Sequence, residues 1–80
     1  MTIDFGIGHE EALDLVNSLT PRQRQVAELI AMGMPRRDIA AQLKIAMPTL
    51  AIHITGACKR LGVETIVGVG RIWFSAKVGR

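Results

Sequence analysis

Apolar residues recur at spacings of three and four along most of the chain, and turn-forming residues interrupt the pattern. The pattern predicts five helices, at about residues 9–17, 21–32, 35–43, 47–61 and 65–77. No apolar run approaches the roughly 20 residues that a membrane-spanning helix needs. We therefore predict an all-α domain, a small four- to five-helix bundle with no membrane partner.

The second predicted helix has the clearest boundaries. Thr20 is suited to the N-cap, Pro21 to the first helical position, and Gln23 completes a Thr-x-x-Gln capping box. Gly33 is suited to end this helix. The next two helices are separated only by a short turn at residues 44–46. Two amphipathic helices joined this closely indicate a helix-turn-helix.

Charge is distributed unevenly along the chain. Residues 1–19 carry four acidic and no basic side chains, whereas residues 20–80 carry ten Lys or Arg against three acidic side chains. A basic body on a small domain favours a polyanionic partner such as nucleic acid. The single cysteine is typical of a reducing, cytoplasmic setting.

A resemblance to a known family is carried by one continuous segment, residues 19–63, LTPRQRQVAELIAMGMPRRDIAAQLKIAMPTLAIHITGACKRLGV. It resembles, without a gap, the LuxR/GerE-type DNA-binding domain, from Leu-Thr-x-Arg at its start to Leu-Gly-Val at its end. The resemblance implies four helices, a helix-turn-helix whose second helix lies in the major groove, and double-stranded DNA as the partner. Region 4 of sigma factors shares the opening motif, but Gly62-Val63 and the final helix favour the LuxR type.

Several positions depart from the pattern of that family. Gln23 and Gln25 stand where the family has two glutamates. Lys44 stands in place of a frequent glycine, and a positive φ there would cost a lysine about 1 kcal/mol. Ala46 stands in place of a serine N-cap, which implies a further loss of about 1 kcal/mol.

The helix at 47–61 has an inward arc of Leu50, Ile54, Ala57 and Leu61 at 100° per residue. The opposite arc offers no Arg, Asn or Gln for bidentate reading of guanine or adenine. We expect weakened base reading, with phosphate contacts from nearby basic residues and Gly56 allowing close approach. The predicted DNA-binding residues are Arg22, Arg36, Arg37, Thr49, Ala51, Ile52, Thr55, Lys59 and Arg60.

The last helix carries Ile66, Val69 and Trp73 on one side, with Gly70 beside them. Two interpretations remain open for these residues. They are either plain core or the seam of a homodimer, in which the glycine would let two helices pack closely. The resemblance implies the seam, because the last helix commonly mediates dimerisation in the family.

Catalytic, metal and cofactor sites are not indicated. His9, His53 and Cys58 match no zinc spacing, and we expect His53 to be a partly buried helix residue and Cys58 a small core residue. The Gly-x-Gly pairs at 6–8 and 68–70 lack the strand–glycine–helix context of a nucleotide site. We therefore predict no enzyme, no metal and no cofactor.

Two functional hypotheses follow. The first is a dimeric, DNA-binding transcriptional regulator; the second is a protein-interaction module that pairs with another regulator and modulates it. We divide the chain into an acidic arm with a short helix at 1–18, a LuxR-type domain at 19–77 and a tail at 78–80. Since family members usually carry a sensing domain ahead of this one, we expect a stand-alone protein or an excised domain.

Overall fold

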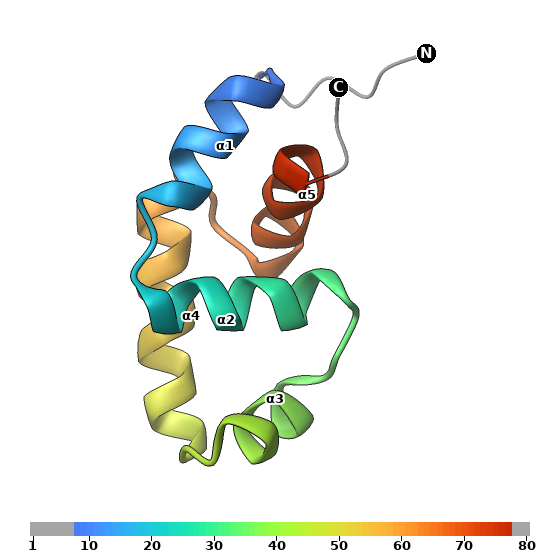
Figure 1. Ribbon diagram of the computed structural model, residues 1–80. Helices are drawn as coiled ribbons and strands as arrows, with labels where there is room; N and C mark the ends of the chain where they lie inside the picture. The colour runs from blue at the N-terminus through green and yellow to red at the C-terminus, as the bar shows by residue number, and fades with distance from the viewer. Residues whose placement is uncertain (1–7, 78–80) are drawn as a thin grey trace.

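A computed structural model describes residues 8–77 of the chain. Five helices account for its regular structure, and this part of the chain contains no strand. The all-α prediction is confirmed. The helices are α1 (His9–Asn17), α2 (Pro21–Ala31), α3 (Arg36–Leu43), α4 (Met47–Leu61) and α5 (Ile66–Lys77) (Figure 1). The proposed tail at 78–80 and the first seven residues of the acidic arm lie outside the described residues.

Local sequence sets the start of α2 as predicted. The Thr20 hydroxyl accepts a hydrogen bond from the Gln23 backbone N–H at 3.1 Å, and the Gln23 side-chain oxygen accepts one from the Thr20 N–H at 3.0 Å. Pro21 occupies the first turn, where its missing N–H leaves no partner unsatisfied. The complete capping box therefore fixes the entry of the chain into α2.

Three helices end in the same way, with a residue in the left-handed conformation. These residues are Gly33 at φ 84°, Lys44 at φ 58° and Gly62 at φ 72°. In each case the next N–H bonds back to a carbonyl five residues earlier, as in the 3.0 Å bond from the Ile45 N–H to the Ala40 carbonyl. This bond satisfies a carbonyl at the helix end and turns the chain sharply. The two turns that flank α3 are therefore short and fixed.

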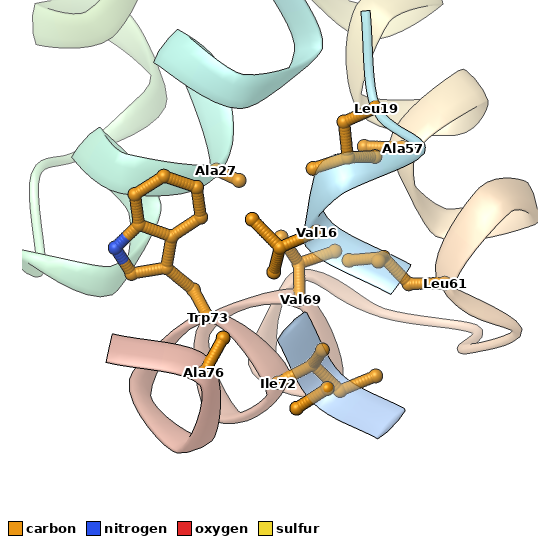
Figure 2. Packing of buried hydrophobic residues seen from close by; sticks show 10 residues of the cluster. Val16, Leu19, Ala27, Ala57, Leu61, Val69, Ile72, Trp73 and Ala76 are labelled. Atoms are coloured by element: carbon orange, nitrogen blue, oxygen red, sulfur yellow. The ribbon is translucent and has the colours of Figure 1, made fainter. Parts of the chain in front are cut away.

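Two apolar clusters form the core. One joins α2, α3 and α4 and holds the helix-turn-helix together; its buried residues are Val26, Leu29, Ile39, Ala40, Leu50 and Ile54. The other joins α1, α2, α4 and α5, and Trp73 of α5 reaches toward Ala27 of α2 in it (Figure 2). α4 contributes to both clusters, so its orientation is fixed along its length.

Helix α1 is part of the same core. Its Ala12 and Val16 are 0% and 1% exposed and belong to the cluster that contains α5. The ring Nδ1 of His9 lies 2.8 Å from the Ser75 carbonyl oxygen, a hydrogen bond between the start of α1 and the end of α5. The short helix that we assigned to the acidic arm thus shares its packing with the rest of the domain, and the boundary at residue 18 stays a prediction.

Candidate nucleic-acid interface

Helix α4 buries one side and exposes the other along its whole length. The inward residues Leu50, Ile54, Ala57 and Leu61 are all less than 7% exposed, as their spacing predicted. The opposite side, which we call the outward face of α4, consists of Pro48, Ala51, Ile52, Thr55 and Lys59, all exposed. Thr49 is also exposed, in the first turn. The helix therefore presents an exposed side opposite the core.

The turn before α4 carries both of the predicted departures. Lys44 is the one non-glycine residue with positive φ in the described chain, so its Cβ carries the steric cost of that conformation. Ala46 is the N-cap and supplies no side-chain hydrogen bond. Pro48 lies in the first turn, where proline is tolerated. The start of α4 is therefore held by its packing and not by its cap.

Basic residues of α3 border the outward face of α4. Arg36, at the start of α3, lines one surface hollow together with Thr55 and Lys59. Arg37 lines a second hollow with Met47, the first residue of α4. A side chain from each of two helices thus reaches the same surface, which the sequence could suggest only through the expected helix-turn-helix geometry.

Cys58 of α4 also lies beside Arg36, since both residues line the same hollow. Burial raises the pKa of the Cys58 thiol above its ordinary value of 9.0, and the guanidinium of Arg36 opposes this by lowering the pKa. The charge of Arg36 is therefore felt across the α3–α4 contact. Cys58 itself is half-buried and packs against both core clusters, as expected for a small core residue.

Two other predicted residues take different positions. The Arg60 guanidinium donates a 2.6 Å hydrogen bond to the Ser18 carbonyl, so it ties α4 to the turn between α1 and α2. Arg22 is half-buried in the first turn of α2. Neither lines the hollows that Arg36 shares with α4. Their contact with a nucleic acid stays a prediction.

The space beside Gly56 is already occupied. A Cβ at this position would lie 2.5 Å from the side-chain nitrogen of Gln23, a residue of α2, at the point where α2 crosses α4. We expected the glycine to allow close approach of DNA, whereas in the structure it accommodates α2. The crossing depends on tertiary packing, and periodicity within α4 contains no signal for it.

Sequence reasoning missed two residues at the edge of this surface. Met47, the first residue of α4, is 47% exposed beside Arg37, and its position next to Arg37 depends on the packing of α3 against α4, for which the sequence contains no local signal. Glu64 lines the hollow of Arg36 and places a negative charge at its rim. Its position after the helix end gave no indication of this proximity.

The residues predicted for the dimer seam pack within the chain. Val69 is 0% and Trp73 8% exposed, and Ile66 packs against the helix-turn-helix cluster. A Cβ at Gly70 would lie 3.6 Å from the Cα atom of Ala31, so α5 lies close to α2 there. The exposed apolar side chains of α5 are instead Val67 and Phe74, at 58% and 60%.

No group of three or more His, Cys, Asp or Glu side chains in residues 8–77 is placed to hold a metal ion. His53 is half-buried at the edge of the inward side of α4. None of the helices in the described chain combines the length and the hydropathy of a membrane span. The surface described above offers cations, methyl groups and hydroxyls, with the carboxylate of Glu64 beside them.

Comparison with known proteins identifies relatives of this arrangement. The sequence model of a family described as bacterial regulatory proteins, luxR family, matches residues 17–72. The nitrate/nitrite response regulator protein NarL of Escherichia coli K12 is 38% identical over 52 residues, which cover 65% of this chain and 24% of that protein. The transcriptional regulatory protein UhpA of the same strain is 41% identical over 56 residues, 70% of this chain and 29% of that protein.

A homologue of the nitrate/nitrite response regulator in Haemophilus influenzae is 36% identical over 59 residues, 74% of this chain and 28% of that protein. The chain thus spans about a quarter of the length of these curated relatives. The family match begins at the end of α1 and includes the helix-turn-helix.

Proposed function

The chain belongs to the LuxR family of bacterial regulatory proteins, and on that premise we propose that it binds double-stranded DNA as a transcriptional regulator, with α4 in the major groove. One observation carries the proposal. Arg36 of α3 and Lys59 of α4 line the same hollow on the exposed side of α4, so cations border the surface that would enter the groove. The setting of such a function is the bacterial cytoplasm.

Affinity would come mainly from phosphates. Arg36 and Arg37 are exposed at the start of α3, and Lys59 is exposed in the last turn of α4. Each phosphate contact of this kind releases counterions and makes binding salt-dependent. Thr49 offers a hydroxyl near the start of α4, where helix N-termini commonly meet phosphates. Binding of this type positions the protein but carries no sequence information by itself.

Base reading would be weak in hydrogen bonds. The outward face of α4 offers Ala51, Ile52 and Thr55 before Lys59, and only Thr55 among the three has a side-chain hydrogen-bonding group. Bidentate recognition uses Arg or Lys for guanine and Asn or Gln for adenine, and Lys59 is the one such side chain on this face. We propose that selectivity is modest compared with a regulator that carries several such donors there.

Dimerisation through α5 is part of the proposal. Val67 and Phe74 lie seven residues apart and two helical turns along the same side of α5. Both are more than half exposed, and exposed apolar patches on small domains mark interfaces. A homodimer that buries these two side chains would present two copies of α4 to DNA. Val69 and Trp73, which we predicted for the seam, are buried within the chain, and for this reason we propose the exposed side of α5.

A protein-interaction module is the second candidate, because the same exposed side chains suit it. Ile52 is 70% and Phe74 60% exposed, on different helices. In that case the chain would bind another regulatory protein and modulate it without strong DNA binding of its own.

Titration of a fluorescently labelled duplex distinguishes the two. Anisotropy is measured over a salt series, beginning at low ionic strength, with mixed-sequence duplex DNA. The DNA-binding proposal expects that the logarithm of the affinity falls steeply and linearly with the logarithm of the salt concentration. Absence of binding at low salt, or binding without salt dependence, would favour the protein-interaction module.

A further inference from the structure

Ile52 is the most exposed large apolar side chain in the described part of the chain, at 70%. It lies in the middle of α4, on the outward face, and lines a shallow hollow with Ala51 and Thr55. An isolated exposed isoleucine needs no explanation in itself. The position of Ile52 does need an explanation, because Ile52 lies on the surface that Arg36 and Lys59 border.

The hydrogen-bonding capacity around Ile52 is small. Ala51 has none in its side chain, Thr55 has a single hydroxyl, and the ammonium-bearing Lys59 lies two helical turns further along α4. A G·C pair in the major groove presents N7 and O6 acceptors and an amino donor, without a methyl group. If Ile52 covered that edge, these groups would lose water without gaining partners, which is unfavourable. An A·T pair presents as many polar groups, N7, O4 and an amino donor, but adds the 5-methyl group of thymine, which an aliphatic side chain can bury favourably. The preference therefore rests on the methyl group.

The charges around this face favour DNA over an apolar protein partner. Lys59 lines both the hollow of Ile52 and the hollow of Arg36, so cations stand within one or two helical turns of the isoleucine. An apolar protein surface docked here would remove these cations from water without neutralising them. A duplex provides phosphates at the groove edges and methyl groups at its floor, and so satisfies both kinds of side chain.

We propose that Ile52 reads the 5-methyl group of thymine, so that the DNA partner is selected for thymine at the centre of the contact. The methyl groups of Ala51 and Thr55 widen the same apolar surface. The proposal rests on the DNA binding proposed above and adds a base preference to it. Ile52 is then a specificity-determining residue, whereas Arg36 and Lys59 supply affinity that is independent of sequence.

Three duplexes of identical length test this without knowledge of the natural target. They are an alternating adenine–thymine duplex, its uracil counterpart, which lacks only the 5-methyl groups, and an alternating guanine–cytosine duplex. Every register of the first presents thymine methyl groups to α4. We expect the thymine duplex to bind at least about fourfold more tightly than the uracil duplex, the factor for burying one methyl-sized group. The guanine–cytosine duplex should bind no more tightly than the uracil one.

Two variants assign the effect to its residue. Ile52→Ala should bring the thymine-to-uracil affinity ratio close to one while leaving the salt dependence unchanged. Met32→Ala is the matched control, because Met32 is 69% exposed but lies at the end of α2. It should keep the ratio of the unmodified chain. Circular dichroism checks that both variants remain helical.

The outcomes separate the two proposals. If the unmodified chain binds thymine and uracil duplexes equally, with normal salt dependence, the thymine preference is wrong and DNA binding stands. If Ile52→Ala keeps the ratio, another group or the duplex itself causes it, and the role of Ile52 is wrong. If none of the duplexes binds at low salt, the proposed function fails first.

Discussion

The side-chain nitrogen of Gln23 would lie only 2.5 Å from a Cβ at residue 56, so Gln23 and Gly56 are matched where α2 packs against α4. The same glutamine accepts the Thr20 N–H in the capping box. One side chain therefore both closes the start of α2 and fits against the missing side chain of α4.

This relationship predicts a coupled stability effect. Gly→Ala inside a helix normally stabilises by about 1 kcal/mol. We expect Gly56→Ala to give less than this gain, because the end of the Gln23 side chain must shift and its bond to Thr20 is weakened. In a Gln23→Ala background the same change should stabilise by about 1 kcal/mol. Urea unfolding of the four proteins measures the difference, and equal effects in both backgrounds would contradict the coupling.

Lys44 predicts a simple stabilising substitution. Its φ of 58° suits glycine, and a Cβ in that conformation costs about 1 kcal/mol. We expect Lys44→Gly to raise the midpoint of thermal unfolding by roughly 4–8 °C. Lys44→Ala, which removes the charge but keeps the Cβ, is the control and should show no such rise. A gain of equal size in both variants would point to the charge and not to the backbone.

The border of basic residues predicts a change in salt dependence. Replacing Arg36 and Arg37 with alanine should lower the slope of log affinity against log salt by about 0.9 for each phosphate that the variant no longer neutralises. Arg24→Ala with Arg71→Ala removes the same charge, and Arg24 lies in a hollow on the α5 side of α2. This control should weaken binding less and change the slope little. Equal slopes for the two double variants would show that α3 does not contact phosphates.

The exposed side of α5 predicts the oligomeric state. Phe74→Glu should abolish a homodimer in light scattering while leaving the monomer fold intact, because Phe74 is 60% exposed. Trp73→Ala should instead destabilise the fold by about 3–5 kcal/mol, since the indole is buried in the core. A dimer that survives Phe74→Glu would place the seam elsewhere.

Cys58 provides a chemical test of the α3–α4 contact. Because burial raises its thiol pKa, the thiolate is scarce at mildly alkaline pH and alkylation by iodoacetamide should be slower than for a free thiol. Arg36→Ala should slow it further, because the opposing effect of the guanidinium is then absent. Lys77→Ala, at the far end of α5, should leave the rate unchanged.

The same shift fixes a sign for the pH dependence of folding. The folded chain holds the thiol proton to higher pH than the unfolded chain. The contribution of Cys58 to the stability of the fold is therefore present below the ordinary thiol pKa of 9.0. It is lost as pH rises above that value, because the unfolded state then releases the proton first. A Cys58→Ala variant should lack this part of the loss of stability at alkaline pH.

Local signals predicted most of the fold. Thr20 and Gln23 formed the expected capping box, Gly33 and Gly62 ended their helices, and the inward side of α4 followed from a period of 3.6. Each of these features depends on residues that are close in sequence. The family resemblance then supplied the three-dimensional relation of the two central helices, and the family match agrees with it.

Contacts between distant residues could not be predicted in the same way. The bond from Arg60 to Ser18 joins residues 42 positions apart, so no spacing rule indicated that this arginine is engaged within the chain. α5 carries apolar residues on both sides, with Val69 buried and Val67 exposed, so periodicity could not tell which side was the core. The surface role of a side chain was thus unpredictable wherever tertiary packing decided it.

The hydrogen bond between His9 and Ser75 brings the start of the first helix to the end of the last. Figure 1 shows these helix ends on the side of the molecule away from α3 and the first turn of α4. Joined ends of this kind are compatible with circular permutation and with tandem fusion. A second copy or a reporter domain could thus be attached there, leaving the α3 side unobstructed, and the order of the helices along the chain could be changed without changing their packing.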